Sequence, residues 1–410
     1  MPMPFVIYTA PNYTENAVRF IETFLKLPGI TLGLISGEAV ELLRSDLRQH
    51  LAAFYKVEDV FDAEQLLQAV QSLANQQGTV HRLLGAVEQL QVPMAQVREQ
   101  LGINGMGVEA AKNFRDKDRM KALFQQAGIP CARYQTVRAV AETQQFIADV
   151  GFPIIAKPTA GAGSLSTYKI QDAAQLDKIL PTLLITPGSE VLLEEFITGH
   201  ECSFDTFSLH GKPVFHSLTH YYPNPIDVVR APWIQWQVIL PREIDAPQYD
   251  DIRQIAFKTL ETLGMTTGLT HLEWFRRKDG SIAISEVAAR PPGAQIPTLL
   301  SRANDFDAIA AWAKLMVYEE FLPPQRKYAV GCAYLRGMGS GRVVAVHGLE
   351  EVNQQVGHLI TDFKIPAVGQ SASPSYEGEG YIILRHPETE VVRQALQFVV
   401  STVKVELRQG

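Results

Sequence analysis

The chain has 410 residues, of which 46% are hydrophobic and 20% are charged, as in a folded globular protein rather than a disordered one. This length exceeds that of one ordinary hydrophobic core and predicts two or three domains. The net charge is −7, so the chain has no excess of basic residues of the kind that binds nucleic acid, and nucleic acid is not expected as a partner.

The three cysteines, Cys131, Cys202 and Cys332, are odd in number and far apart in the sequence. Their spacing predicts neither a disulfide framework nor a zinc site of the CxxC kind, and it favours a reducing compartment. The first residues do not have the pattern of a signal peptide, and no run approaches eighteen consecutive apolar residues. We therefore expect a cytoplasmic protein without a membrane partner.

The first hundred residues alternate short apolar runs with amphipathic stretches. Residues 5–10 and 30–36 are expected to form buried strands, and residues 16–27 and 63–77 have apolar residues at helical spacing. This alternation predicts an α/β domain with a parallel sheet. The sequence contains neither GxGxxG after the first strand nor GxxxxGK[ST], which weakens the interpretation as a Rossmann dehydrogenase or a P-loop protein.

The stretch FPIIAKPTAGAGSLSTYKI (152–170) predicts two strands joined by a turn rich in glycine and hydroxyl groups. Lys157 ends the first strand, Gly161 and Gly163 allow close approach of the backbone, and Ser164 offers a hydroxyl donor to a phosphate. Such a loop can close over a polyphosphate. It is also typical of an ordinary surface hairpin.

Two other segments carry charges in suggestive places. Lys117 lies at the start of a basic helix (115–130), where a solvated lysine is the ordinary explanation. LEEF (193–196) places Glu194 and its neighbour at the end of an apolar strand, and Glu201 follows after a glycine. These acids are suited to hydrogen bonds from an adenine amino group or ribose hydroxyls, although an exposed strand end would look the same.

The stretch HLEWFRRKDGSIAISEVAARPPG (271–293) predicts a hairpin with one glutamate on each strand. If Lys278 pairs with Ser281, Glu273 lies directly opposite Glu286. Facing carboxylates are destabilising unless a divalent cation lies between them, and Mg²⁺ prefers such oxygen ligands.

Arg290 follows the second glutamate and is suited to neutralise a transferring phosphoryl group. Two other interpretations of the hairpin stay open at this point: a glycosidase with two carboxylates, and a structural hairpin with an unfavourable charge pair. Upstream, Tyr222, Arg230, Trp233 and Trp236 are candidates for a substrate pocket, and ordinary packing explains the aromatic residues equally well.

Taken in order, these motifs resemble the ATP-grasp superfamily, and within it the carboxylate–amine ligases related to L-amino acid ligases and biotin carboxylase. The resemblance implies an α/β fold in three parts. These are an α/β preATP-grasp domain over residues 1–112, a two-lobed ATP-grasp domain over residues 113–325 with its flap lobe at about 130–200, and a C-terminal α/β lobe over residues 326–410.

The resemblance also implies a role for each motif. Lys117 and Lys157 would bind the phosphates of ATP, and Arg290, with Lys157, would act in catalysis by stabilising the transition state. Mg²⁺, or Mn²⁺ as a substitute, would be held by Glu273 and Glu286. The remaining nucleotide contacts would be Gly161, Gly163, Ser164, Glu194, Glu195, Phe196, Ile197 and Glu201. Substrate contacts would come from Tyr222, Arg230 and Arg290.

The implied activity is an ADP-forming ligase that joins a small carboxylate to an amine through an acyl phosphate. Members of the superfamily are often homodimers, so a homodimer is one expectation. Ala288 replaces the asparagine of the common E-x-N-x-R pattern, and because alanine cannot bind a metal, the number of metal ions stays open. Two alternatives also stay open: a bicarbonate-activating enzyme resembling biotin carboxylase, and a non-catalytic ATP-binding scaffold.

Overall fold

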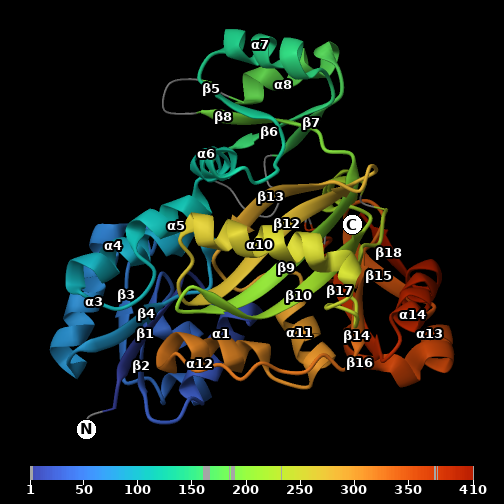
Figure 1. The fold of residues 1–410 in the computed structure, drawn as a ribbon. Coiled ribbons are helices and arrows are strands. Elements are labelled where there is room, and N and C mark those ends of the chain that lie inside the picture. The colour runs from blue at the N-terminus through green and yellow to red at the C-terminus, as the bar shows by residue number, and fades with distance from the viewer. Residues whose placement is uncertain are drawn as a thin grey trace.

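The computed structural model describes residues 3–159, 167–183, 185, 190–231, 233–373, 375 and 377–409. Three larger sheets and one small one organise this part of the chain, with helices packed against them (Figure 1). The predicted mixed α/β fold class is confirmed. None of the helices described is long and apolar enough to cross a membrane.

The N-terminal region is a parallel sheet in the strand order β3-β2-β1-β4. The predicted strands at 5–10 and 30–36 and the helices near 16–27 and 63–77 are confirmed, since these segments form β1, β2, α1 and α3. Side chains cap both helices, Thr14 before α1 and Asp62 before α3. The bounds are β1 (Phe5–Ala10), α1 (Glu15–Leu25), β2 (Thr31–Ser36), η1 (Val40–Leu42), α2 (Ser45–Arg48), β3 (Ala53–Lys56), α3 (Ala63–Gln77), β4 (Val80–Leu84), η2 (Glu88–Leu90) and α4 (Gln91–Leu101).

A small lobe stands apart from the rest of the molecule at the top of Figure 1. Its antiparallel sheet has the order β5-β8-β6-β7, and two helices cover one face around Phe146 and Leu176. Its elements are β5 (Tyr134–Val137), α7 (Val140–Val150), β6 (Ile154–Pro158), β7 (Tyr168–Ile170), α8 (Ala173–Leu183) and β8 (Val191–Glu195). It follows α5 (Val108–Arg115) and α6 (Lys117–Ala127). Helix α6 begins at the Asp116 cap and ends, as predicted, at Gly128, which is left-handed.

The large sheet has the order β13-β12-β9-β10-β11-β14-β17-β16, and each neighbouring pair is antiparallel. Helix α10 crosses one face of β9, β10 and β12 (Figure 1). The bounds are β9 (Gly199–Leu209), β10 (Lys212–Tyr222), α9 (Pro225–Arg230), β11 (Gln237–Leu240), η3 (Pro247–Tyr249), α10 (Asp250–Leu263), β12 (Gly268–Arg277), β13 (Ile282–Ala288), α11 (Ile296–Asn304), α12 (Ala308–Tyr318), β14 (Ala329–Leu335), β16 (Ile360–Lys364) and β17 (Gly380–His386).

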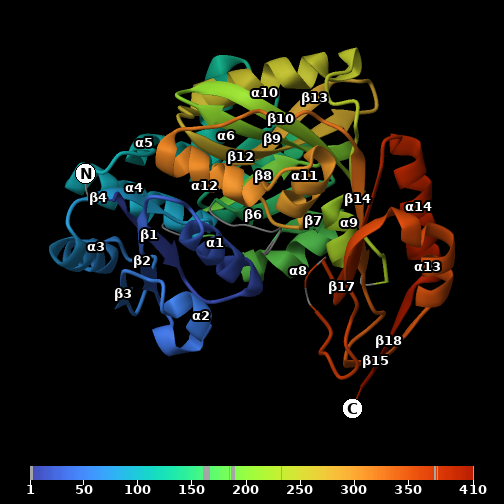
Figure 2. The same ribbon diagram turned by 90° about the horizontal axis from the view of Figure 1, so that it is seen from below.

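The C-terminal region shares this sheet, because β14 pairs with β11 and carries β17 and β16 beyond it. The sheet thus continues across residue 325, and the boundaries proposed at 112 and 325 stay predictions. The remaining elements are β15 (Arg342–His347), α13 (Leu349–Val356), η4 (Gly357–Leu359), α14 (Thr389–Thr402) and β18 (Lys404–Arg408). Helices α13 and α14 lie at the opposite end of the molecule from the N-terminal sheet (Figure 2).

Aromatic packing ties the N-terminal region to the large sheet. Phe20 and Phe24 of α1 meet Trp312 of α12 edge-on, with ring centroids 5.3 and 5.8 Å apart. Because α12 follows the hairpin of β12 and β13 in the chain and belongs to the same core, this contact holds the N-terminal loops beside that hairpin.

Candidate active site

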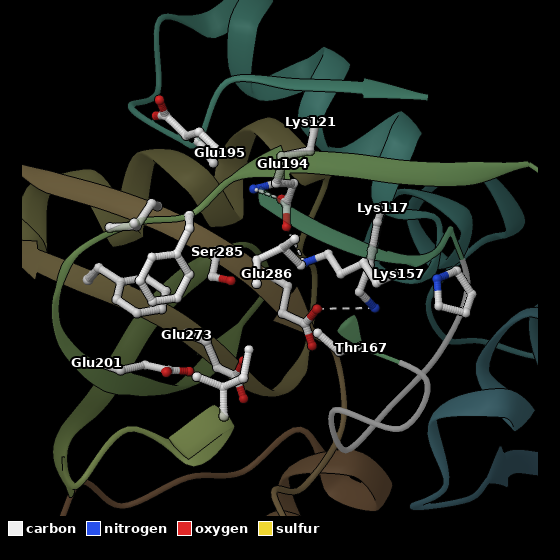
Figure 3. A pocket seen from close by; sticks show the side chains of 17 residues that line it. Lys117, Lys121, Lys157, Thr167, Glu194, Glu195, Glu201, Glu273, Ser285 and Glu286 are labelled. Atoms are coloured by element: carbon white, nitrogen blue, oxygen red, sulfur yellow. Dashed lines mark ion pairs between the residues drawn. The ribbon is translucent and has the colours of Figure 1, made fainter. Parts of the chain in front are cut away.

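A charged cavity lies between the small lobe and the large sheet (Figure 3). Helix α6 contributes two lysines, the small lobe contributes one lysine and two glutamates, and strands β9, β12 and β13 of the large sheet contribute one glutamate each. The charged residues that line it are Lys117, Lys121, Lys157, Glu194, Glu195, Glu201, Glu273 and Glu286. The structure therefore gathers most of the charged residues selected from the sequence, although they span 170 positions of the chain.

Glu194 lies between two lysines at the small-lobe side of this cavity. Its carboxylate oxygens are 2.6 Å from Lys157 Nζ and 2.8 Å from Lys121 Nζ, and all three side chains are buried. Burial alone would raise the pKa of Glu194, but the two lysines outweigh it and lower the pKa to about 2. Glu194, which was predicted to contact adenine, is therefore a carboxylate held between the ammonium groups of Lys121 and Lys157.

The sequence analysis missed Lys121. This lysine follows Lys117 by one helical turn, and both belong to the buried face of α6 together with Met120 and Phe124. A lysine on the apolar face of an amphipathic helix is unusual. The helical periodicity of this segment places Lys121 on that face, so the sequence contained a signal that Lys121 is buried.

Lys117 forms an ion pair with Glu286 of β13, and the Nζ of Lys117 is 3.1 Å from Glu286 Oε2. Burial alone would raise the pKa of Glu286, but Lys117 and Lys157 outweigh it and hold the pKa well below its usual value. For Lys157, burial would lower the pKa, and Glu194 and Glu286 raise it overall. The pKa shifts of Lys157, Glu194 and Glu286 thus favour the charged form of each of these groups.

Glu273 lies opposite Glu286 in the hairpin of β12 and β13, which confirms the predicted register. The predicted turn is wrong in detail, because the N–H of Arg277, rather than Lys278, pairs with the carbonyl of Ser281 at 2.8 Å. The register near the turn is therefore shifted by one residue. A bulge at Ser285 shifts it back before the glutamates.

This bulge has a consequence for the cavity. Consecutive residues of a regular strand face opposite sides of the sheet, yet Ser285 and Glu286 both line the charged cavity. The bulge therefore turns the two neighbouring side chains toward the same space (Figure 3).

The segment between β8 and β9 forms the outer edge of the charged cavity. Glu195 binds Arg133 and Arg277, at 2.7 and 3.3 Å, and the backbone N–H of Phe196 donates to Pro153 at 3.2 Å. Ile197 also lines the cavity. These contacts fix the course of the connection between the two lobes.

Glu201 enters the cavity from the start of β9 and is buried. Burial raises the pKa of Glu201 well above its usual value, and the charges of Glu273 and Glu286 raise it further. This environment favours protonation of Glu201 relative to an exposed glutamate, and a protonated carboxyl group can donate as well as accept a hydrogen bond.

A second, wider cavity of about 430 Å³ lies on the other side of Glu273 and Glu286, which line both cavities. We call it the wide cavity. Its walls come from the N-terminal loops and from the large sheet. The polar and aromatic lining residues include Tyr8, Asn12, Thr14, Asn16, Glu88, Gln89, Tyr221, Trp236, His271 and Arg290. The sequence analysis assigned no site residue to the N-terminal region, since single polar residues in its loops carry no local signal.

Arg290 lies in the wide cavity rather than in the charged one. Its Nη2 is 3.0 Å from Glu88 Oε2, and Glu88 also binds Arg115 at 2.8 Å. The N-terminal region thus holds the arginine through a buried carboxylate. Arg290 and Glu286 both line the wide cavity.

His271 is a further residue of the wide cavity that the sequence analysis missed. Its Nδ1 is 2.7 Å from Asp205 Oδ1, and its Nε2 is 3.6 Å from Glu273 Oε1. Burial alone would lower the pKa of His271, but Asp205 and Glu273 outweigh it and raise the pKa to about 9. The ring is therefore an imidazolium at neutral pH. Its position two residues before Glu273 on the same strand face was the available signal.

His271 pairs directly with Ala288 across the hairpin. Where the common motif of the superfamily has a metal-binding amide, this chain has a small side chain facing a cationic ring. Ala288 lines the wide cavity, so its size also leaves room there.

The predicted substrate residues are placed differently. Tyr222 packs on the ring of His200 at 4.8 Å and accepts a hydrogen bond from Arg393 at 3.1 Å, and it is not among the described residues that line either cavity. Trp236 lines the wide cavity, whereas Trp233 is exposed. Gly161, Gly163, Ser164 and the side chain of Arg230 lie outside the part of the chain that is described.

The donor set of the charged cavity fits a magnesium ion. Glu273 and Glu286 are opposed on neighbouring strands, and Glu201 is close enough for their charges to raise its pKa. A hard divalent cation bound by Glu273 and Glu286 would relieve this repulsion with the oxygen ligands that Mg²⁺ prefers.

Comparisons with known proteins agree with this geometry. Residues 122–303 match the ATP-grasp domain family. An L-arginine-specific L-amino acid ligase of Bacillus subtilis is 24% identical over 296 residues, covering 71% of this chain and 70% of that protein. The crystal structure of an L-amino acid ligase from Bacillus licheniformis has a TM-score of 0.79 with 16% identity and covers 100% of both chains.

A third similar protein is the biotin carboxylase domain of the 2-oxoglutarate carboxylase from Hydrogenobacter thermophilus, solved as a dimer with MgADP, ADP and bicarbonate. Its TM-score is 0.68 with 16% identity, over 97% of this chain and 90% of that one. The chain therefore contains an ATP-grasp domain, and the resemblance found in its sequence is confirmed. The predicted enzyme class, an ADP-forming ATP-grasp ligase, is confirmed as well.

Proposed function

We propose that the protein joins a small carboxylate to an amine, with conversion of ATP to ADP and phosphate through an acyl phosphate. The observation that carries this proposal is the wall shared by the two cavities: Glu273 and Glu286 line both. Phosphates held in the charged cavity would meet, at this wall, a carboxylate held in the wide cavity.

The charged cavity is the proposed nucleotide site. Lys117 and Lys157 would bind the phosphates of ATP, and Lys121 adds a third ammonium group. Glu194, the segment Glu195–Ile197 and Glu201 would meet the base and ribose. The buried Glu194 supports this assignment, because it orients Lys121 and Lys157 before the nucleotide arrives.

Glu273 and Glu286 would hold Mg²⁺, with Mn²⁺ as a substitute that offers similar coordination. The ion would neutralise charge on the phosphates while the transfer takes place. Lys117, already 3.1 Å from Glu286, would share that task from the protein side.

The wide cavity is the proposed site of the carboxylate and the amine. The carboxylate oxygen would attack the γ-phosphorus and ADP would leave; the amine nitrogen would then attack the acyl carbon, and phosphate would leave. Arg290 and His271 would stabilise the negative charge of the carboxylate and of the acyl phosphate. Closing the site against water would protect the intermediate from hydrolysis.

Bicarbonate activation is the second candidate, because the biotin carboxylase domain has a similar fold. The volume of the wide cavity, about 430 Å³, favours two organic substrates over a bicarbonate ion. We also propose that the enzyme acts in the cytoplasm and forms a homodimer; the three cysteines, all free, are consistent with the first suggestion.

A screen of ADP release tests the proposal. The purified protein is incubated with ATP, Mg²⁺ and pooled amino acids and small carboxylates, and the products of active pools are identified by mass spectrometry. We expect ADP and a product with an amide bond only when both a carboxylate and an amine are present. ADP release with bicarbonate alone would favour the second candidate, and AMP as the product would contradict the proposal.

A further inference from the structure

Two histidines and a cysteine converge on the sheet face that lies opposite the charged cavity. His200 and Cys202 are two residues apart on β9, so their side chains share one face, and His220 on β10 pairs directly with Cys202. Glu201, between the first two, faces the other way and lines the charged cavity. The cluster is therefore separate from the proposed magnesium site.

The ligand atoms of this cluster already stand at coordination distances from one another. His220 Nδ1 is 3.1 Å from His200 Nε2 and 3.3 Å from Cys202 Sγ, and all three atoms lie within 4.8 Å of each other. Around a tetrahedral zinc ion, Zn–N bonds of about 2.0 Å and Zn–S bonds of about 2.3 Å place neighbouring ligand atoms roughly 3.3–3.6 Å apart. The two distances to His220 Nδ1 would lengthen by a few tenths of an ångström to admit an ion, and the separation between the ligand atoms of His200 and Cys202, which is at most 4.8 Å, would have to settle in the same range.

A second layer of contacts fixes the orientation of His220. Its Nε2 is 3.0 Å from the hydroxyl of Tyr249, the residue just before α10. In the tautomer in which Nε2–H donates to the hydroxyl oxygen, the Nδ1 lone pair is available to an ion beside His200 and Cys202, which is how outer partners generally orient metal-binding histidines. His200 is held by stacking on His220 and Tyr222, with ring centroids at 5.3 and 4.8 Å.

The protonation states are compatible with metal binding. Burial lowers the pKa of His220 to about 3 and lowers that of His200, so both rings are neutral at pH 7. Burial raises the pKa of the Cys202 thiol, which would lose its proton on binding. The positive charges of Arg276 and Arg393 lie near the cluster. Arg276 favours the thiolate form of Cys202, and both arginines repel a metal cation.

We propose that His200, Cys202 and His220 bind one divalent cation of the zinc type, with the fourth position open to a water molecule or another ligand. Nitrogen and sulfur donors select such borderline metals, whereas Mg²⁺ prefers the oxygen donors of the charged cavity. His200 is only partly buried and gives the ion a route from solvent.

Such an ion would join the beginning of β9 to β10. The same strand carries Glu201 and follows the connection between the two lobes, so the bound ion would stiffen the edge of the nucleotide site. We expect a higher thermal unfolding temperature with zinc than after chelation.

Cobalt(II) provides the test, because a thiolate bound to Co²⁺ has a charge-transfer absorption in the near ultraviolet. Protein stripped with a chelator is titrated with CoCl₂ in excess Mg²⁺, which occupies the carboxylate site. We expect the absorption to saturate at one ion per chain and to disappear when Zn²⁺ displaces Co²⁺. The absence of this absorption, or binding of Co²⁺ without it, would overturn the proposal.

Variants locate the site. Cys202→Ser should remove the absorption and weaken zinc binding at least tenfold, and His200→Ala, at a partly exposed position, should weaken it without affecting the core. Cys131→Ser is the matched control, since Cys131 is a free cysteine away from the cluster, and it should keep the full signal. A signal that persists in Cys202→Ser, or that is lost in Cys131→Ser, contradicts the assignment.

Discussion

The two cavities that meet at Glu273 and Glu286 differ in the charge of their walls. The charged cavity is lined by lysines and glutamates that neutralise one another within a few ångströms. The wide cavity has mainly aromatic and small uncharged walls, with Arg290, Glu88 and His271 as its charged groups besides the shared glutamates.

Under the proposed function, the difference matches what each cavity would bind. A triphosphate brings several negative charges, so its site needs ammonium groups held in place beforehand, and the glutamates keep them in place at the cost of a crowded charge network. Organic substrates are recognised by shape and a few charges, which suits the wide cavity.

Glu286→Gln removes a charge from the shared wall and should impair both cavities at once. We expect the rate of ADP release to fall by about 10²- to 10³-fold, because the proposed magnesium ion would lose one of its two carboxylate ligands. Steady-state ADP release measures the effect. Glu406→Gln, an exposed glutamate on β18, is the control and should keep full activity; equal activity of Glu286→Gln and the wild type would remove the metal assignment.

Glu194→Gln tests the charge network of the charged cavity alone. It leaves Lys121 and Lys157 buried together without their carboxylate, and we expect the free energy of unfolding to fall by about 3 kcal/mol in urea denaturation. Adding Lys121→Met should recover part of this loss. A stability equal to that of the wild type would mean that the network does not hold the lysines.

The same glutamate predicts a pH dependence. Because the folded-state pKa of Glu194 is lowered to about 2, its stabilising contribution is complete above the unfolded-state pKa of about 4.3 and is lost as the pH falls toward 2. The difference in unfolding free energy between wild type and Glu194→Gln should therefore shrink across this window. A constant difference would contradict the shift.

His271→Gln tests the wide cavity alone. Glutamine can still donate to Asp205 but carries no charge beside Glu273. We expect product formation to fall about tenfold, which is about 1.4 kcal/mol of transition-state stabilisation, with unchanged affinity for ATP. His347→Gln, at an exposed position at the end of β15, serves as the control. A loss of ATP affinity instead would place His271 in the nucleotide site.

Ala288→Asn should have the smallest effect. The new amide would lie opposite the imidazolium of His271 and take up room in the wide cavity, so we expect a loss of activity of less than about tenfold, with little change in the Mg²⁺ concentration needed for half-maximal rate. Titration of activity with Mg²⁺ measures this. A markedly lower requirement for Mg²⁺ would show that the asparagine restores a metal ligand.

Much of the charged cavity could be predicted because its residues lie on motifs with local signals. Lys157 and Glu194 each lie at the end of an apolar strand, and Glu273 and Glu286 lie on two apolar runs that flank a short turn. The bulge at Ser285 could not be predicted from the sequence, since a bulge depends on the packing of both strands against the sheet.

The fold class and the order of the motifs could be predicted from the sequence, because hydrophobic periodicity and charges at strand ends are signals within short stretches of chain. The facing of Glu273 and Glu286 depended in addition on the bulge at Ser285, which compensates for a turn that is shifted by one residue. Only the tertiary structure decided that Glu88 meets Arg290, that His271 faces Ala288, and that His200, Cys202 and His220 come together. The first of these contacts joins residues 202 positions apart. Such contacts depend on how whole sheets and lobes pack, and that packing leaves no mark in the spacing of neighbouring residues.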